Sequence, residues 1–241
     1  MKKSVLLCGT GTRLGHMTLE TAEALRRCER VLCVNLPEEL FRDVRRKFER
    51  AEALDFADSL EEALCASARA WFSTRARPGA ELGVLFVGHP LIYSSAPALI
   101  EQCRRLRRPY RVFPGVSAGD VALAVAESAL SGRQFDSYGT GLVVRSAQQL
   151  LARRARLDPR SAIVLLNLFQ LRPGSARRAG SWLRLVDHLE RFFPPGHPAI
   201  LLWGSHDGAP DVKRASTVRG LRKLALPIDS RAALFIPMRR S

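Results

Sequence analysis

Two short loops contain the residue types from which a ligand site could be built. Gly88-His89-Pro90 and Pro114-Gly115-Val116-Ser117 each follow a short apolar run typical of a buried strand, and each precedes a helical pattern. Glycine lets a ligand approach the backbone closely, and proline holds a turn without an N–H of its own. Because neither loop has an acidic residue, lysine or arginine, we expect backbone groups there to bind a ligand of modest charge. Two unconnected structural turns are the alternative.

A third glycine-rich loop, GTGTRLG at residues 9–15, follows the first apolar run. It differs from the dinucleotide-binding fingerprint because Leu14 stands where the third glycine belongs. The second apolar run ends in Asn35, where that fingerprint has an acidic residue for the ribose. A Rossmann-type dinucleotide site is therefore excluded, and both a tight turn and a ligand loop remain open.

The elements around these loops alternate between strand and helix. Thr18 and Ser59 are predicted N-caps, the latter with Glu62 in a capping box. Strands are expected at 5–8, 30–35, 83–87 and 110–113, and helices at 18–28, 59–72 and 96–106. This alternation predicts a largely parallel sheet that is covered on both faces.

The second half of the chain has a different rhythm. Helices are expected at 118–130, 147–157 and 181–193, strands at 162–169, 199–205 and 232–238, a strand-like run at 134–144 and a long hairpin excursion at 204–231. The third of these helices is expected to turn Leu183, Val186, Leu189 and Phe193 inward. We predict an α/β protein of two subdomains, residues 1–113 and 114–241.

Composition limits the classes of function. The 241 residues are 46% hydrophobic and only 7% aromatic, which suits an aliphatic α/β core. The net charge of +15 could attract nucleic acid or an acidic peptide, or reflect arginines on solvated helix faces. The basic runs contain only isolated aromatic residues and not the aromatic interleaving of a base-stacking platform, so we do not expect nucleic acid as the partner.

Membrane and metal functions are also not expected. No apolar run approaches the roughly 20 residues of a membrane span, and the N-terminal apolar run is too short for a signal peptide, so we expect a cytoplasmic protein. The five cysteines form no CxxC pair, and the histidines are scattered. We therefore expect mostly buried free thiols and no bound metal.

The order of the motifs resembles that of the tetrapyrrole-methylase-like, class III S-adenosylmethionine-dependent methyltransferases. Within that superfamily it is most similar to the borosin peptide backbone α-N-methyltransferases. The motifs that carry the resemblance are GTGTRLGHMTLETAEAL, FVGHPLIYSSAPALIEQCRR, PGVSAGDVAL, SYGTGLVV and RLDPRSAIVLLNLFQL. The resemblance covers nearly the whole chain.

This resemblance implies two α/β subdomains, S-adenosylmethionine as cofactor in the cleft between them, and a homodimer. The implied cofactor contacts are Gly9, Gly11, Gly88, His89, Pro90, Leu91, Tyr93, Ser117, Ala118, Tyr138, Leu168 and Gln170. Core packing is the alternative role for Tyr138 and Leu168, and helix capping for Ser117.

The sequence departs from the borosin pattern in the segment before the third predicted strand. Borosin methyltransferases have tyrosines and an arginine there, which help a peptide amide to react. Here Glu61 and Cys65 stand at two of those positions, and Val87 precedes the GHP turn where a tyrosine is often found. A backbone amide is a poor nucleophile, so its methylation needs alignment and help with charge. Tyr93 and His89 are the nearby candidates for that catalytic role.

We therefore expect a borosin-like methyltransferase that acts on a separate peptide, at its backbone amide nitrogen, because no C-terminal substrate segment follows the last strand. The arginine-rich surface could dock an acidic leader. The alternatives are a tetrapyrrole or corrin methyltransferase, a ribosomal RNA methyltransferase, and a catalytically degenerate subunit that binds S-adenosylmethionine and partners an active enzyme in a hetero-oligomer.

Overall fold

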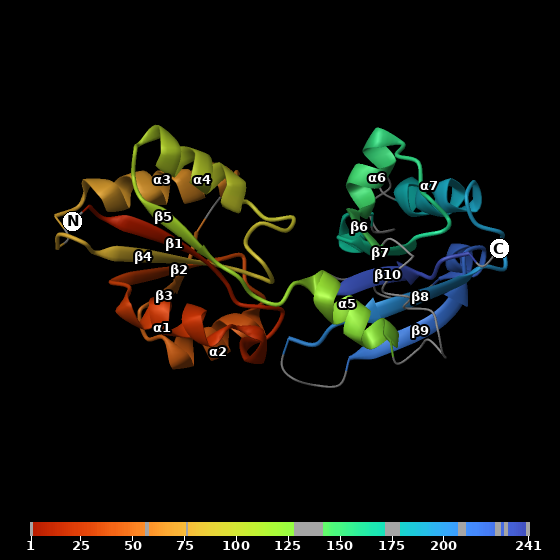
Figure 1. Cartoon of the computed structure of the whole chain (residues 1–241), viewed down its shortest axis with the longest axis horizontal. Coiled ribbons are helices and arrows are strands. Elements are labelled where there is room, and N and C mark those ends of the chain that lie inside the picture. The colour runs from red at the N-terminus through yellow and green to blue at the C-terminus, as the bar shows by residue number, and fades with distance from the viewer. Residues whose placement is uncertain are drawn as a thin grey trace. The chain divides into compact units, whose positions relative to one another are not determined.

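The computed structural model describes residues 2–55, 58–75, 77–127, 142–171, 179–206, 211–224, 228 and 231–239. The chain forms two compact units (Figure 1). Unit 1 is Met1–Ser117 with His206–Ala209, and unit 2 is Ala118–Ser205 with Pro210–Ser241. Each unit contains one five-stranded sheet.

The sheet of unit 1 is entirely parallel, in the order β3-β2-β4-β1-β5. Its strands are β1 (Ser4–Gly9), β2 (Arg30–Val34), β3 (Ala51–Ala53), β4 (Glu81–Phe86) and β5 (Tyr110–Phe113). The prediction of a parallel sheet is confirmed for this half of the chain. The short edge strand β3 was not predicted, because its sequence Ala-Glu-Ala has no strand signal.

Helices cover both faces of this sheet. The helices α1 (Leu19–Arg27) and α2 (Glu38–Lys47) lie on one face, and α3 (Leu60–Ser73) and α4 (Ala96–Arg105) on the other (Figure 1). Both predicted N-caps are confirmed. The Thr18 hydroxyl accepts a hydrogen bond from the Thr21 amide (3.1 Å), and the Ser59 hydroxyl accepts one from the Glu62 amide (3.3 Å). Each bond satisfies one of the free amides at the start of a helix.

The sheet of unit 2 is mixed, in the order β6-β7-β10-β8-β9. Its strands are β6 (Leu142–Ser146), β7 (Ala162–Leu166), β8 (Pro198–Trp203), β9 (Val212–Thr217) and β10 (Ala232–Ile236). Only β6 and β7 pair in parallel, and the other three pairs are antiparallel. The sequence predicted a parallel sheet for the first half of the chain and made no prediction of strand direction for this second sheet.

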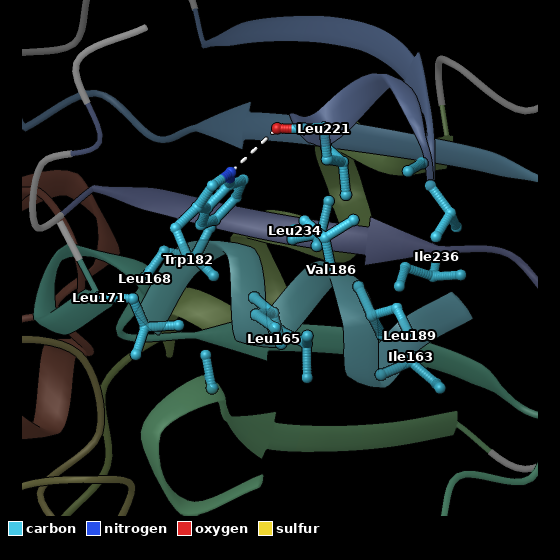
Figure 2. Close-up of a cluster of buried hydrophobic side chains, with 14 of the residues drawn as sticks. Ile163, Leu165, Leu168, Leu171, Trp182, Val186, Leu189, Leu221, Leu234 and Ile236 are labelled. Atoms are coloured by element: carbon cyan, nitrogen blue, oxygen red, sulfur yellow. Dashed lines mark hydrogen bonds between the residues drawn. The ribbon is translucent and has the colours of Figure 1, made fainter. Parts of the chain in front are cut away.

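Unit 2 has two clusters of buried hydrophobic residues. The larger lies between the sheet and the helices α6 (Ala147–Arg153) and α7 (Ala179–Glu190). In the other, α5 (Ala118–Glu127) packs against other side chains of β7, β8 and β10. Figure 2 shows Trp182, Val186 and Leu189 of α7 against side chains of β7 and β10. The Trp182 indole N–H donates to the Leu221 carbonyl (2.9 Å), which lies in the short helix η3 (Gly220–Lys223).

The sequence placed Leu183 on the inner side of α7, which is wrong. Its side chain is 44% exposed, whereas Trp182 is 3% exposed. Trp182 precedes the buried Leu189 of the same helix by 7 residues, close to two helical turns, and Leu183 is about 100° away from Trp182 around the helix. Val186, Leu189 and Phe193 are buried as expected.

All five cysteines are free thiols, as predicted, and all but Cys65 are buried. Burial raises the pKa of both Cys28 and Cys33 to about 12, so these thiols are neutral at physiological pH. None of the helices in the described part of the chain is long and apolar enough to cross a membrane.

Candidate functional site

Three glycine-containing loops of unit 1 meet at the carboxyl ends of β1, β4 and β5. The Gly88 amide donates to the Gly11 carbonyl (2.9 Å), and the Gly11 amide donates to the Gly88 carbonyl (3.3 Å). The third loop joins through an isolated bridge between Met17 and Gly115. The structure thus brings together the GTGT, GHP and PGVS loops, and we call this cluster the loop junction.

Side chains cannot be accommodated at the centre of the loop junction. A Cβ on Gly9 would lie 2.4 Å from the Gly88 carbonyl oxygen, and one on Gly115 would lie 2.6 Å from the same atom. Gly11 and Gly88 also have φ angles of 72° and 71°, which favour glycine. The close approach of the loops to one another therefore explains these glycines, independently of any ligand.

The segment after Gly88 presents apolar side chains to solvent. Pro90 is buried, whereas Leu91, Ile92 and Tyr93 are 49%, 41% and 39% exposed. Tyr93 has a φ of 51°, an uncommon conformation for a residue other than glycine. Three consecutive exposed apolar residues in such a turn are suited to contact with a ligand or partner.

His89, one of the two catalytic candidates, is held by its own turn. Its Nδ1 accepts a hydrogen bond from the Leu91 amide (3.1 Å). In a neutral imidazole with this bond, the proton is on Nε2. His89 can therefore donate a hydrogen bond to a ligand, but as a neutral group it has no second lone pair with which to accept a proton.

Other predicted cofactor residues differ in their surroundings. Ser117 is buried and Ala118 is exposed, at the start of α5. Leu168 is fully buried in the core of unit 2, beside Trp182 (Figure 2), which fits the alternative role of core packing. Tyr138 lies outside the described residues.

Gln170 has the feature most typical of a ligand contact. It lies in the short helix η2 (Leu168–Leu171), which follows β7, and its side-chain Oε1 is buried without a hydrogen-bond partner among the described residues. Leaving a buried acceptor unpaired costs roughly 1–3 kcal/mol. An N–H or O–H group of a ligand would remove this cost.

Glu61 and Cys65, which stand at the positions of the borosin arginine and tyrosine, line a groove between α3 and α4. The Cys65 thiol donates to the Ala98 carbonyl (3.7 Å), and burial raises its pKa. Neither side chain has the chemistry of the group that it replaces. No cluster of three or more metal-ligating side chains occurs in the described ranges.

One histidine at the loop junction was missed by sequence reasoning. His206 follows β8, and its Nδ1 hydrogen-bonds to the Thr12 carbonyl (2.5 Å). The Thr12 hydroxyl in turn contacts Nδ1 of His16 (2.9 Å). Nε2 of His206 is buried and has no hydrogen-bond partner within the described ranges. No sequence pattern signals this contact, because Thr12 and His206 lie near opposite ends of the chain.

Comparison with known proteins identifies the family. The family described as Tetrapyrrole (Corrin/Porphyrin) Methylases matches residues 4–204. No curated protein matches the sequence.

Similar solved structures share this fold. A uroporphyrin-III C-methyltransferase from Thermus thermophilus has a TM-score of 0.71 and 22% identity, covering 98% of this chain and 92% of its own. A uroporphyrin-III C-methyltransferase structure from the same organism, complexed with S-adenosyl homocysteine, has a TM-score of 0.66 and 16% identity, covering 97% and 96%. The putative cobalamin synthesis related protein CobF from Corynebacterium diphtheriae has a TM-score of 0.67 and 14% identity, covering 99% of each chain. The predicted two-subdomain α/β fold is confirmed.

Proposed function

Because the chain belongs to the tetrapyrrole (corrin/porphyrin) methylase family, and is thus an S-adenosylmethionine-dependent methyltransferase, we propose that it methylates a separate peptide at a backbone amide nitrogen. The observation that carries the proposal is the loop junction, where the motifs that resemble those of the borosin methyltransferases meet at the carboxyl ends of parallel strands. Parallel α/β sheets bind ligands at the carboxyl ends of their strands.

The residues present fit the cofactor, which supplies a methyl group bound to a positively charged sulfur. In unit 1, Oγ of Ser95 is buried and lacks a hydrogen-bond partner among the described residues. The amino and hydroxyl groups of S-adenosylmethionine are donors that could satisfy such acceptors. Leu91 and Tyr93 are exposed apolar groups that could cover its apolar surface.

The chain contributes mainly position to the reaction. Direct displacement requires the acceptor nitrogen, the methyl carbon and the sulfur to lie in line, and holding two reactants in that geometry removes much of the barrier. The hydrogen bonds between Gly11 and Gly88 fix two of the loops against each other. A rigid loop junction thus suits the alignment that a poor nucleophile needs.

A tetrapyrrole acceptor is the second candidate, and the family and the similar structures favour it. Tetrapyrrole precursors are polycarboxylates, which the net charge of +15 would also attract. For the peptide substrate, the same charge favours an acidic leader segment. We further propose that the working form is a homodimer or a hetero-oligomer with a related methyltransferase.

The test uses the full chain with a radiolabelled methyl donor. Calorimetry first measures binding of S-adenosylmethionine and of its demethylated product. The protein is then incubated with peptides that have acidic leaders, with reduced uroporphyrin III and with RNA. Light scattering gives the oligomeric state.

We expect label in a peptide, located by fragmentation on a backbone nitrogen. Label in the porphyrin would establish the second candidate, and label in RNA would indicate a ribosomal RNA methyltransferase. Binding of the cofactor without transfer to any acceptor would indicate a degenerate subunit. Failure to bind the cofactor would contradict every form of the proposal.

A further inference from the structure

We propose that His206 is the catalytic base that removes the proton from the acceptor, an inference that rests on the proposed methyl transfer. The sequence offers no tyrosine or arginine where the borosin enzymes have them. The structure instead places an imidazole at the loop junction, with Nε2 buried and without a partner among the described residues.

The contact with Thr12 determines which nitrogen of His206 is basic. A backbone carbonyl can only accept, so Nδ1 of His206 must donate its proton to the Thr12 oxygen (2.5 Å). In the neutral ring Nε2 then carries a lone pair and no proton. A carbonyl that fixes the tautomer and orientation of an imidazole is a common arrangement around functional histidines.

Thr12 is itself held in place. It is 6% exposed, and its hydroxyl contacts Nδ1 of His16 (2.9 Å), whose Nε2 accepts from the Arg13 guanidinium (2.9 Å). The carbonyl that orients His206 is thus part of a hydrogen-bonded loop. A fixed orientation is what a general base needs in order to reach one defined proton.

The two other histidines of these loops are not suited to the same role. Both nitrogens of His16 are engaged, one by Thr12 and one by Arg13. His89 accepts at Nδ1 from the Leu91 amide, so its neutral ring offers a proton at Nε2. Of the three imidazoles, His206 is the one whose contacts leave a basic nitrogen available.

The proposed step is balanced. The acceptor nitrogen forms a bond to the methyl carbon while the carbon–sulfur bond breaks, and the electron pair of that bond stays on sulfur as a neutral thioether. The nitrogen that has gained the methyl group but still has its proton is positively charged, and the N–H of such a cation is strongly acidic, so Nε2 of His206 takes the proton and becomes an imidazolium. One positive charge therefore passes from sulfur to His206.

His206→Asn tests the proposed role of Nε2 most directly. The asparagine amide can still donate to the Thr12 carbonyl from about the position of Nδ1, but Nε2 is removed. We expect unchanged affinity for S-adenosyl homocysteine, turnover lowered by about 10²–10⁴-fold, and partial recovery with added imidazole. His197→Asn is the matched control, because Nε2 of His197 bonds to the Pro237 carbonyl (2.7 Å) in unit 2, and its turnover should stay within about twofold of wild type.

A second measurement needs no acceptor. Nitrogen-15 NMR of histidine-labelled protein, with His206→Asn for assignment, should find the neutral His206 ring protonated at Nδ1. A proton on Nε2 would overturn the proposal, as would turnover of His206→Asn within about threefold of wild type or loss of its S-adenosyl homocysteine binding. A wild-type protein that methylates no acceptor would contradict the proposed function, and this inference with it, whatever the variant does.

Discussion

The carbonyl oxygen of Gly88 occupies the space that a side chain on Gly9 would need, since a Cβ there would lie 2.4 Å from it. Gly9 is the last residue of β1, and Gly88 follows the end of β4. The close approach therefore continues the packing of these neighbouring strands beyond their last sheet hydrogen bonds. A steric limit of this kind predicts a large effect from the smallest possible substitution.

Gly9→Ala should lower the free energy of unfolding by about 1–3 kcal/mol, because the added methyl group must displace backbone that cannot move without breaking the loop junction. Urea unfolding measures this change. Gly15→Ala is the control, since nothing lies within 4 Å of its Cβ position, and it should change stability by no more than about 0.5 kcal/mol. Equal effects of the two substitutions would contradict the close-packed loop junction.

Gln170→Leu should separate cofactor binding from folding. Its Oε1 has no hydrogen-bond partner within the described ranges, so its replacement by a similar apolar side chain should change stability by less than about 1 kcal/mol. If a cofactor N–H binds this oxygen, affinity for S-adenosylmethionine should fall about tenfold, as calorimetry would detect. Gln149→Leu, at an exposed position of the same unit, should leave the affinity unchanged. Unchanged affinity in Gln170→Leu would remove this residue from the cofactor site.

Trp182→Phe should destabilise unit 2. The indole N–H donates to the Leu221 carbonyl from a side chain that is only 3% exposed (Figure 2). Phenylalanine would lose this hydrogen bond, so that the oxygen keeps only its bond from the Leu224 amide (3.3 Å), and its smaller ring would leave space in the core. We expect a loss of roughly 2–4 kcal/mol in thermal or urea unfolding. Leu183→Ala, one residue away but 44% exposed, should cost clearly less. The reverse order would mean that α7 is rotated about its axis.

Arg222→Met should make stability less dependent on pH in the acid range. Arg222 donates to the carboxylates of Glu190 (2.7 Å) and Asp187, and the first of these bonds holds the pKa of Glu190 below its ordinary value of 4.5. A lowered carboxyl pKa contributes stability above pH 4.5 that is lost as the pH falls through the folded-state pKa. Wild type should therefore be the more stable protein at about pH 7, and urea midpoints should converge towards about pH 3. A difference that stays constant with pH would contradict the ion pair.

The features that the sequence predicted well depend on neighbours along the chain. Thr18 and Ser59 cap helices because the amides that they accept from are three residues away. The parallel sheet of unit 1 follows from helices that alternate with buried strands. The glycines of the three loops marked the strand ends correctly, although the sequence could not reveal that the loops fill one another's space.

The features that the sequence missed depend on contacts between distant segments. The antiparallel partners of β10 are decided by how β7 and β8 pack, which no local pattern encodes. Leu183 and Trp182 both suit an apolar face, and only the packed core decides between them. The orientation of His206 is fixed by a hydrogen bond to Thr12, near the other end of the chain.

The order of strands in the two sheets suggests a role for several charged residues that does not depend on a ligand. The edge strands are β3, β5, β6 and β9, and each has an exposed charged residue: Glu52, Arg111, Arg145, and Lys213 with Arg214. Unpaired edges are templates on which other chains can add strands, and charged side chains there oppose aggregation. Replacing Lys213 and Arg214 of β9 with neutral residues is thus expected to increase aggregation of the protein without a direct effect on its chemistry.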